Sequence, residues 1–193
     1  MLPATTLRTL DFDDAVAHVD GGAAFADMRP TDAYLEVHIP GSLPLVYEFG
    51  PGMAARARDC LPLSLPLVLL EDPAADMANA AAALRGKGFT VLGQVSDAIN
   101  SWVRGGRAAA STEVASESIT PAGLVLDVGD PGAVVVESAL RIPIERLWAR
   151  TDEIERDSRV VVVAGFGVRA GLAVGILERA GRDDILFWKA RAG

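Results

Sequence analysis

A run of four valines, Val160 to Val163, followed by a loop with glycines, is the feature that most limits what this chain can fold into. An unbroken run of β-branched residues predicts a strand that is buried on both faces, as strands of parallel sheets are. From Arg169 onward the apolar residues follow the spacing of a helix, which Gly181 ends. The sequence therefore predicts a buried strand, a loop and a helix over residues 159–181.

The loop between this strand and this helix has the features of an anion site. Backbone N–H groups at a strand-to-helix turn can bind an anion, and reactive cysteines occur at such turns because a helix N-terminus stabilises a thiolate. The position of such a cysteine holds Ala164. We therefore predict a candidate anion-binding loop without a nucleophile, made of Gly165, Phe166, Gly167, Val168 and Arg169.

Composition limits the kind of partner that the chain can have. Its 193 residues are 50% hydrophobic and carry a formal net charge of −8. This acidic balance argues against nucleic acid and against anionic membranes, because both bind positively charged surfaces.

Cysteine and histidine are too scarce for most metal sites. The chain has one cysteine and two histidines, which excludes an internal disulfide, a cysteine-based metal cluster and a zinc site made of histidine alone. We expect no metal and no cofactor. We also expect a cytoplasmic protein, because the sequence shows neither a signal peptide nor an apolar run of the ~20 residues that span a bilayer.

The pattern of strands and helices occurs twice. The segment "ALRGKGF" at 83–89 matches "ILERAGR" at 176–182 at an offset of 93, and in the same register the apolar runs 65–70 and 160–163 coincide. Strands that alternate with helices predict α/β domains, each a mostly parallel sheet with helices on both faces.

Two segments are predicted to lack regular structure. Residues 108–118 are small and polar, as linkers are, and residues 49–58 begin with the helix-breaking series Gly50-Pro51-Gly52. We therefore predict a first domain over 1–107, a linker over 108–118, and a second, shorter domain over 119–193.

Each half contains short motifs that resemble parts of one family pattern. The first half contains Asp27-Met28-Arg29-Pro30, Tyr34 and His38-Ile39-Pro40-Gly41-Ser42, with Val37 where a glycine is usual. The second half contains Leu126-Asp127-Val128 and the stretch 160–169. These motifs resemble those of the rhodanese (thiosulfate sulfurtransferase) domain, whose patterns are D-x-R … Y … G-H-I-P-G-A and C-x-x-G-x-R. The resemblance implies two rhodanese-like three-layer domains.

The resemblance also implies that both domains have lost the cysteine that carries out sulfur transfer. Rhodaneses carry sulfur as a persulfide on a loop cysteine, and Ala164 stands at that position in the second half, with Gly167 and Arg169 in place. In the first half Glu71 stands at the cysteine position, and its acidic loop would repel thiosulfate or phosphate. We expect no catalytic residue, only these two vestigial cysteine positions.

Three hypotheses about function remain open. The first is a catalytically inactive tandem module that binds a protein partner or a small anionic or sulfur-containing ligand in sulfur metabolism. The layout is similar to the degenerate rhodanese pairs attached to some bacterial metallo-β-lactamase-fold hydrolases, which implies a bacterial protein whose partner is such a hydrolase or another sulfur-metabolising enzyme. The alternative is a sulfurtransferase or sulfur carrier that uses the lone Cys60, with Arg56 and Arg58 lowering its pKa. A structural homodimer is the third.

The other conspicuous residues are predicted to be structural. Asp27 and Arg29 lie on one strand face and should form an ion pair. His38 should be a hydrogen-bonding residue of its turn. The three tryptophans are expected in the core or at a domain interface, at positions Trp102, Trp148 and Trp188.

Overall fold

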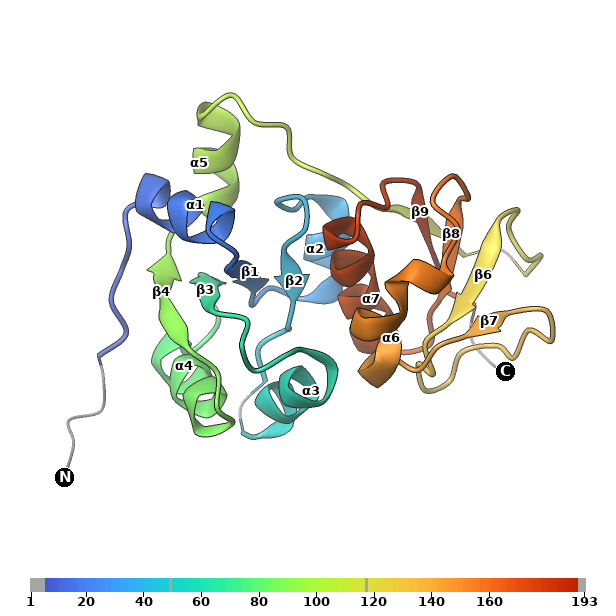
Figure 1. The fold of residues 1–193 in the computed structure, drawn as a ribbon, viewed down its shortest axis with the longest axis horizontal. Helices are drawn as coiled ribbons and strands as arrows, with labels where there is room; N and C mark the ends of the chain where they lie inside the picture. Colours follow the sequence, from blue (N-terminus) through green and yellow to red (C-terminus); the bar gives the residue numbers. More distant parts are fainter. Residues whose placement is uncertain (1–5, 49, 117, 191–193) are drawn as a thin grey trace. The chain divides into compact units, whose positions relative to one another are not determined.

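The computed structural model describes residues 6–48, 50–116 and 118–190, and the chain forms two compact units (Figure 1). The first unit comprises the described residues of Met1–Pro30 and Ser42–Ala109, and the second those of Thr31–Gly41 and Ala110–Gly193. No helix within the described ranges is both long enough and apolar enough to cross a membrane.

The first unit is a parallel sheet with helices on both faces. Its strand order is β2-β1-β3-β4, and each neighbouring pair is parallel. In Figure 1, α1 and α5 lie on one face, and α3 and α4 on the other. The elements are α1 (Phe12–Asp20), β1 (Ala24–Asp27), β2 (Leu43–Pro44), α3 (Gly52–Cys60), β3 (Leu67–Leu70), α4 (Met77–Gly86), β4 (Val91–Val95) and α5 (Ala98–Arg104).

The second unit is a parallel sheet of order β5-β9-β8-β6-β7. Helices α6 and α7 lie on one face (Figure 1), and the partly buried side chains of Ala133, Val134, Val136 and Ala139 pack against a core cluster of the sheet. The α/β class with parallel sheets is confirmed. The elements are α2 (Thr31–Glu36), β5 (Glu113–Ala115), β6 (Leu124–Asp127), β7 (Leu140–Arg141), α6 (Ile144–Arg150), the 3₁₀ turn η1 (Thr151–Glu153), β8 (Val160–Val163), α7 (Val168–Arg179) and β9 (Ile185–Trp188).

The two sheets share one strand order. Strands β7-β6-β8-β9 of the second sheet repeat the order β2-β1-β3-β4 of the first, counted along the chain. Strand β5 adds an edge beside β9, and the first sheet has a reduced form of the same addition, a parallel bridge between Thr9 and Gln94 of β4. This shared order agrees with the internal repeat in the sequence.

Two segments differ from the sequence expectation. The expected linker over 108–118 contains β5, in which Val114 pairs with Phe187. The strand is short and mostly exposed, so it leaves no apolar pattern in the sequence. The segment 49–58 contains most of α3, because Gly50 and Pro51 precede the helix rather than interrupt it. Phe49 itself lies outside the described residues.

The segment Thr31–Gly41 groups with the second unit because α7 binds it. The fully buried His38 places Nδ1 2.8 Å from the carbonyl oxygen of Tyr34 and Nε2 2.9 Å from Oε1 of Glu178 in α7. The N–H of Gly41 donates to Oε2 of Glu178 at 2.7 Å. Since a carbonyl oxygen only accepts, Nδ1 is the donor to Tyr34. The prediction that His38 is a hydrogen-bonding turn residue is confirmed.

Helices α2 and α7 meet closely at Gly171. A Cβ atom there would lie 2.9 Å from Cγ2 of Thr31. In an open helix, Gly→Ala stabilises by ~1 kcal/mol. We expect Gly171→Ala to lower the free energy of unfolding instead, because Thr31 must move, and we expect the added substitution Thr31→Ser to restore most of the loss because it removes the obstructing methyl group.

Urea denaturation measures these differences. The matched control is Gly86→Ala in α4, where an added Cβ meets nothing within 4 Å, and this variant should be no less stable than the parent. Equal stability of Gly171→Ala and Gly86→Ala would contradict the close contact.

Candidate functional site

The loop of residues 164–167 leaves β8 at the carboxyl edge of the second sheet, where parallel sheets place their ligand sites. It lies directly against the loop that follows β6. A Cβ atom on Gly165 would lie 2.0 Å from the carbonyl oxygen of Pro131 and 2.5 Å from the nitrogen of Ala133. Both distances are shorter than any van der Waals contact, so only glycine fits here.

The side-chain carboxylate of Asp130 accepts hydrogen bonds from backbone N–H groups of the predicted anion-binding loop. Oδ2 of Asp130 accepts the N–H of Gly165 at 2.5 Å and the N–H of Gly167 at 3.0 Å. Asp130 is only 5% exposed. Two backbone donors that converge on one oxygen form an anion-binding nest, and charge-assisted bonds of this kind are the strong ones. The loop therefore has the geometry expected of an anion site, and the anion it holds is internal.

Ala164 precedes these donors in the position predicted for a cysteine. It is fully buried, and its N–H donates to the carbonyl oxygen of Trp188 at 2.8 Å, which continues the pairing of β8 with β9. Its methyl group provides no nucleophile, so the covalent step of a sulfurtransferase has no starting atom at this position.

The remaining predicted loop residues are not gathered around a common point. Nη2 of Arg169 donates to Oε1 of Glu145 at 2.5 Å, so this guanidinium already has a carboxylate partner. Phe166 is 72% exposed, and Val168 is the first residue of α7. The structure thus brings together Gly165 and Gly167 around Asp130 and directs the other side chains elsewhere.

The corresponding loop in the first unit begins at Glu71. Its N–H donates to Val95, the last residue of β4, just as that of Ala164 donates to Trp188, the last residue of β9. The two residues are therefore equivalent in the backbone of their units. The Glu71 carboxylate accepts a hydrogen bond from Ser96, and Asp76 caps α4 by accepting the N–H of Asn79 at 3.0 Å. Both acids have structural roles.

Asp27 and Arg29 form the predicted ion pair. Nη2 of Arg29 lies 2.6 Å from Oδ2 of Asp27, which is fully buried at the end of β1. In the second unit Gly129 stands where Arg29 stands in the first, and its N–H donates to Asp127 at 2.8 Å. This ion pair stabilises the chain where β1 ends.

Cys60 is the last residue of α3 and is 4% exposed. Arg56, which was expected to lower the pKa of its thiol, donates instead to the carbonyl oxygen of Leu45 at 2.7 Å and to Glu48 at 3.2 Å. A thiol buried in this way is poorly placed to meet a sulfur donor.

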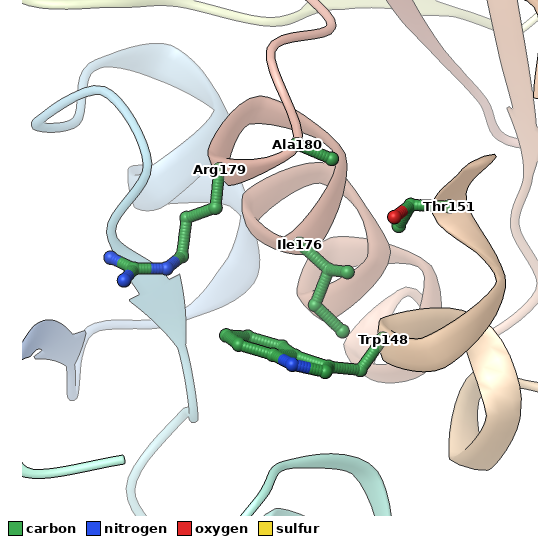
Figure 2. Close-up of a pocket in the computed structure, with 5 residues that line it drawn as sticks. All are labelled: Trp148, Thr151, Ile176, Arg179 and Ala180. Atoms are coloured by element: carbon green, nitrogen blue, oxygen red, sulfur yellow. The ribbon is translucent and has the colours of Figure 1, made fainter. Parts of the chain in front are cut away.

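Two features are not predicted from the sequence. Nothing local indicates that Asp130 contacts a loop 35 residues away. Trp148, assigned to a core or interface, lines a cavity (Figure 2). Within the described part of the chain, no three histidine, cysteine or acidic side chains are grouped so as to hold a metal ion.

No protein-family model matches the chain, and the search of curated proteins finds no match. Among solved structures, the chain is similar to a thiosulfate sulfurtransferase from Pseudomonas aeruginosa, with a TM-score of 0.43 and 16% identity over 96% of this chain. The chain spans only 43% of that enzyme's length.

Two further solved structures are similar. One is a 3-mercaptopyruvate sulfotransferase from Escherichia coli, with a TM-score of 0.40 and 16% identity, covering 97% of this chain and 99% of that one. The other is an NAD-dependent persulfide reductase from A. fulgidus, with a TM-score of 0.37 and 22% identity, covering 62% of this chain and 25% of that one.

The negative charge of Asp130 should raise the pKa of a thiol placed in the loop. In Ala164→Cys we expect a higher thiol pKa than in Ala164→Cys/Asp130→Asn, by ~1 unit or more, because a neighbouring negative charge disfavours the thiolate. Asparagine keeps a carbonyl oxygen for the two N–H donors and removes only the charge.

Thiolate absorbance in the ultraviolet, followed against pH, measures both values. Combining Ala164→Cys with Asp157→Asn, a change at an exposed position of the same unit, controls for net charge and should leave the thiol pKa unchanged. Equal pKa values in all three variants would show that Asp130 does not act on this position.

Proposed function

We propose that this chain is a catalytically inactive, rhodanese-like tandem module that acts in sulfur metabolism by binding and not by sulfur transfer. The observation that carries the proposal is the state of the loop after β8. Its cysteine position is a buried alanine, and two of its N–H donors hold the carboxylate of Asp130.

The tandem part of the proposal is supported by the backbone. Both sheets have the same strand order, and the N–H groups of Glu71 and Ala164 bind the ends of corresponding strands. We infer that the two units are copies of one domain and that both have lost the nucleophile of the family they resemble.

A protein partner is favoured over a small anion as the ligand. Any external anion at the second loop must compete with Asp130, which belongs to the same chain and is therefore always present, and Arg169 is engaged with Glu145. By resemblance, the proposed partner is a separate metallo-β-lactamase-fold hydrolase or another sulfur-metabolising enzyme.

Sulfur transfer through Cys60 is the alternative. A carrier cysteine must reach both donor and acceptor, whereas Cys60 is 4% exposed at the end of α3. Transfer by this route would require α3 to open.

Incubation with thiosulfate and cyanide distinguishes the inactive module from the Cys60 sulfur carrier. We expect no thiocyanate above the level given by Cys60→Ala, and no gain of one sulfur atom in the intact mass after thiosulfate alone, because no exposed thiolate is available to accept the sulfur. Turnover that disappears in Cys60→Ala, together with a persulfide in the parent protein, would overturn the inactive-module proposal and establish the carrier.

A further inference from the structure

The segment of residues 31–41 is attached to α7 at both of its ends. Figure 1 shows α2, which forms the first part of this segment, beside α7. Its first residue packs closely against Gly171. At its other end, the ring of His38 and the N–H of Gly41 bind the two carboxylate oxygens of Glu178. One side chain of α7 therefore holds the whole turn that ends the segment.

The buried ring of His38 has an oxygen atom beside each of its nitrogen atoms. Nδ1 lies 2.8 Å from the carbonyl oxygen of Tyr34, and Nε2 lies 2.9 Å from Oε1 of Glu178. A neutral imidazole has one N–H donor and one acceptor nitrogen. If Nδ1 is the donor, a neutral ring points the lone pair of Nε2 at a carboxylate oxygen, and two buried acceptors then face each other without a hydrogen bond, which is costly. An additional proton between these two atoms removes the conflict.

Contacts to His38 come from three segments, and two of them bring titratable groups. In α2, the ring of Tyr34 stacks on the imidazole, with centroids 4.0 Å apart and an interplanar angle of 17°. From α7 come Glu178 and the next residue, the cation Arg179, whose Cγ packs against the same turn. Residues 110–112 form backbone hydrogen bonds with the segment and have no charged side chain. Because imidazole is a stronger base than a carboxylate by about two pH units, the additional proton belongs on Nε2.

We propose that His38 and Glu178 form a pH-sensitive latch. At neutral pH the pair is an imidazolium and a carboxylate, and at alkaline pH it loses the proton on Nε2, which weakens the attachment of residues 31–41 to α7. This latch does not depend on the proposed binding function.

The direction of the pH dependence follows from the number of bound protons. A free histidine side chain is mostly neutral above pH ~6.5, so the unfolded chain releases a proton that the folded pair keeps. Stability therefore falls as the pH rises above ~6.5, until the folded pair has also lost its proton. One proton corresponds to a rise of up to about tenfold in the unfolding equilibrium constant for each pH unit.

The ¹⁵N chemical shifts of the imidazole nitrogen atoms report the protonation of the ring directly. We expect both ring nitrogens of His38 to carry a proton at pH 8. The chain has two histidines, and His18 lies in α1. The variant His18→Gln therefore leaves only the His38 signals in the spectrum and assigns them.

Glu178→Gln separates the additional proton from the contact itself. Its amide can donate to a neutral Nε2 while its carbonyl oxygen accepts the N–H of Gly41. In this variant we expect a His38 ring with one proton, on Nδ1, at pH 8. Between pH 7 and pH 9, the unfolding equilibrium constant of the parent protein in urea should rise about tenfold or more relative to that of the variant.

Glu137→Gln is the matched control, because it removes a carboxylate at an exposed position of the same unit. It should follow the pH dependence of the parent protein.

Either of two results would overturn the proposal: a His38 ring with one proton at pH 8 in the parent protein, or the same pH dependence of unfolding in the parent protein and in Glu178→Gln. The ring protonation of the parent protein decides the matter even where Glu178→Gln does not fold.

Discussion

Oδ2 of Asp130 accepts two backbone N–H groups from the loop that joins β8 to α7, and the arrangement of this sheet edge depends on that contact. It holds the loops after β6 and β8 so close together that Gly165 can have no side chain. It also satisfies buried donors that would otherwise need water or a ligand. Loops of this kind can stabilise a thiolate or a bound anion. This loop stabilises a carboxylate of its own chain.

The absence of a nucleophile at position 164 and the internal occupation of the loop are consistent with each other. With Ala164 in place the loop has no thiolate to stabilise, and a permanent carboxylate satisfies two of its donors without external ligand. In the corresponding loop of the first unit, Glu71 accepts a hydrogen bond from Ser96 and Asp76 caps α4. The two units thus share a strand order and have different loop chemistry.

Much of the fold could be predicted from the sequence, because β8 and α7 are signalled by local apolar patterns that burial requires. β5 could not be predicted, since a short exposed edge strand needs no such pattern, and α3 was missed because its flanking glycines and proline suggested a loop. Of the site, only the backbone course of strand, loop and helix could be predicted from the sequence. The contacts of Asp130 with the loop and of Arg169 with Glu145 join residues 24 to 37 positions apart, and no local pattern encodes them.

Asp130 already occupies the loop after β8. The most direct test follows the backbone amide resonances of Gly165 and Gly167 during titration with thiosulfate, with Asp130→Ala as the open-loop reference. We expect no saturable shift of either resonance in the parent protein and a saturable shift in Asp130→Ala, because only the variant frees both N–H groups. A saturable shift of both resonances in the parent protein, as strong as in the variant, would contradict it.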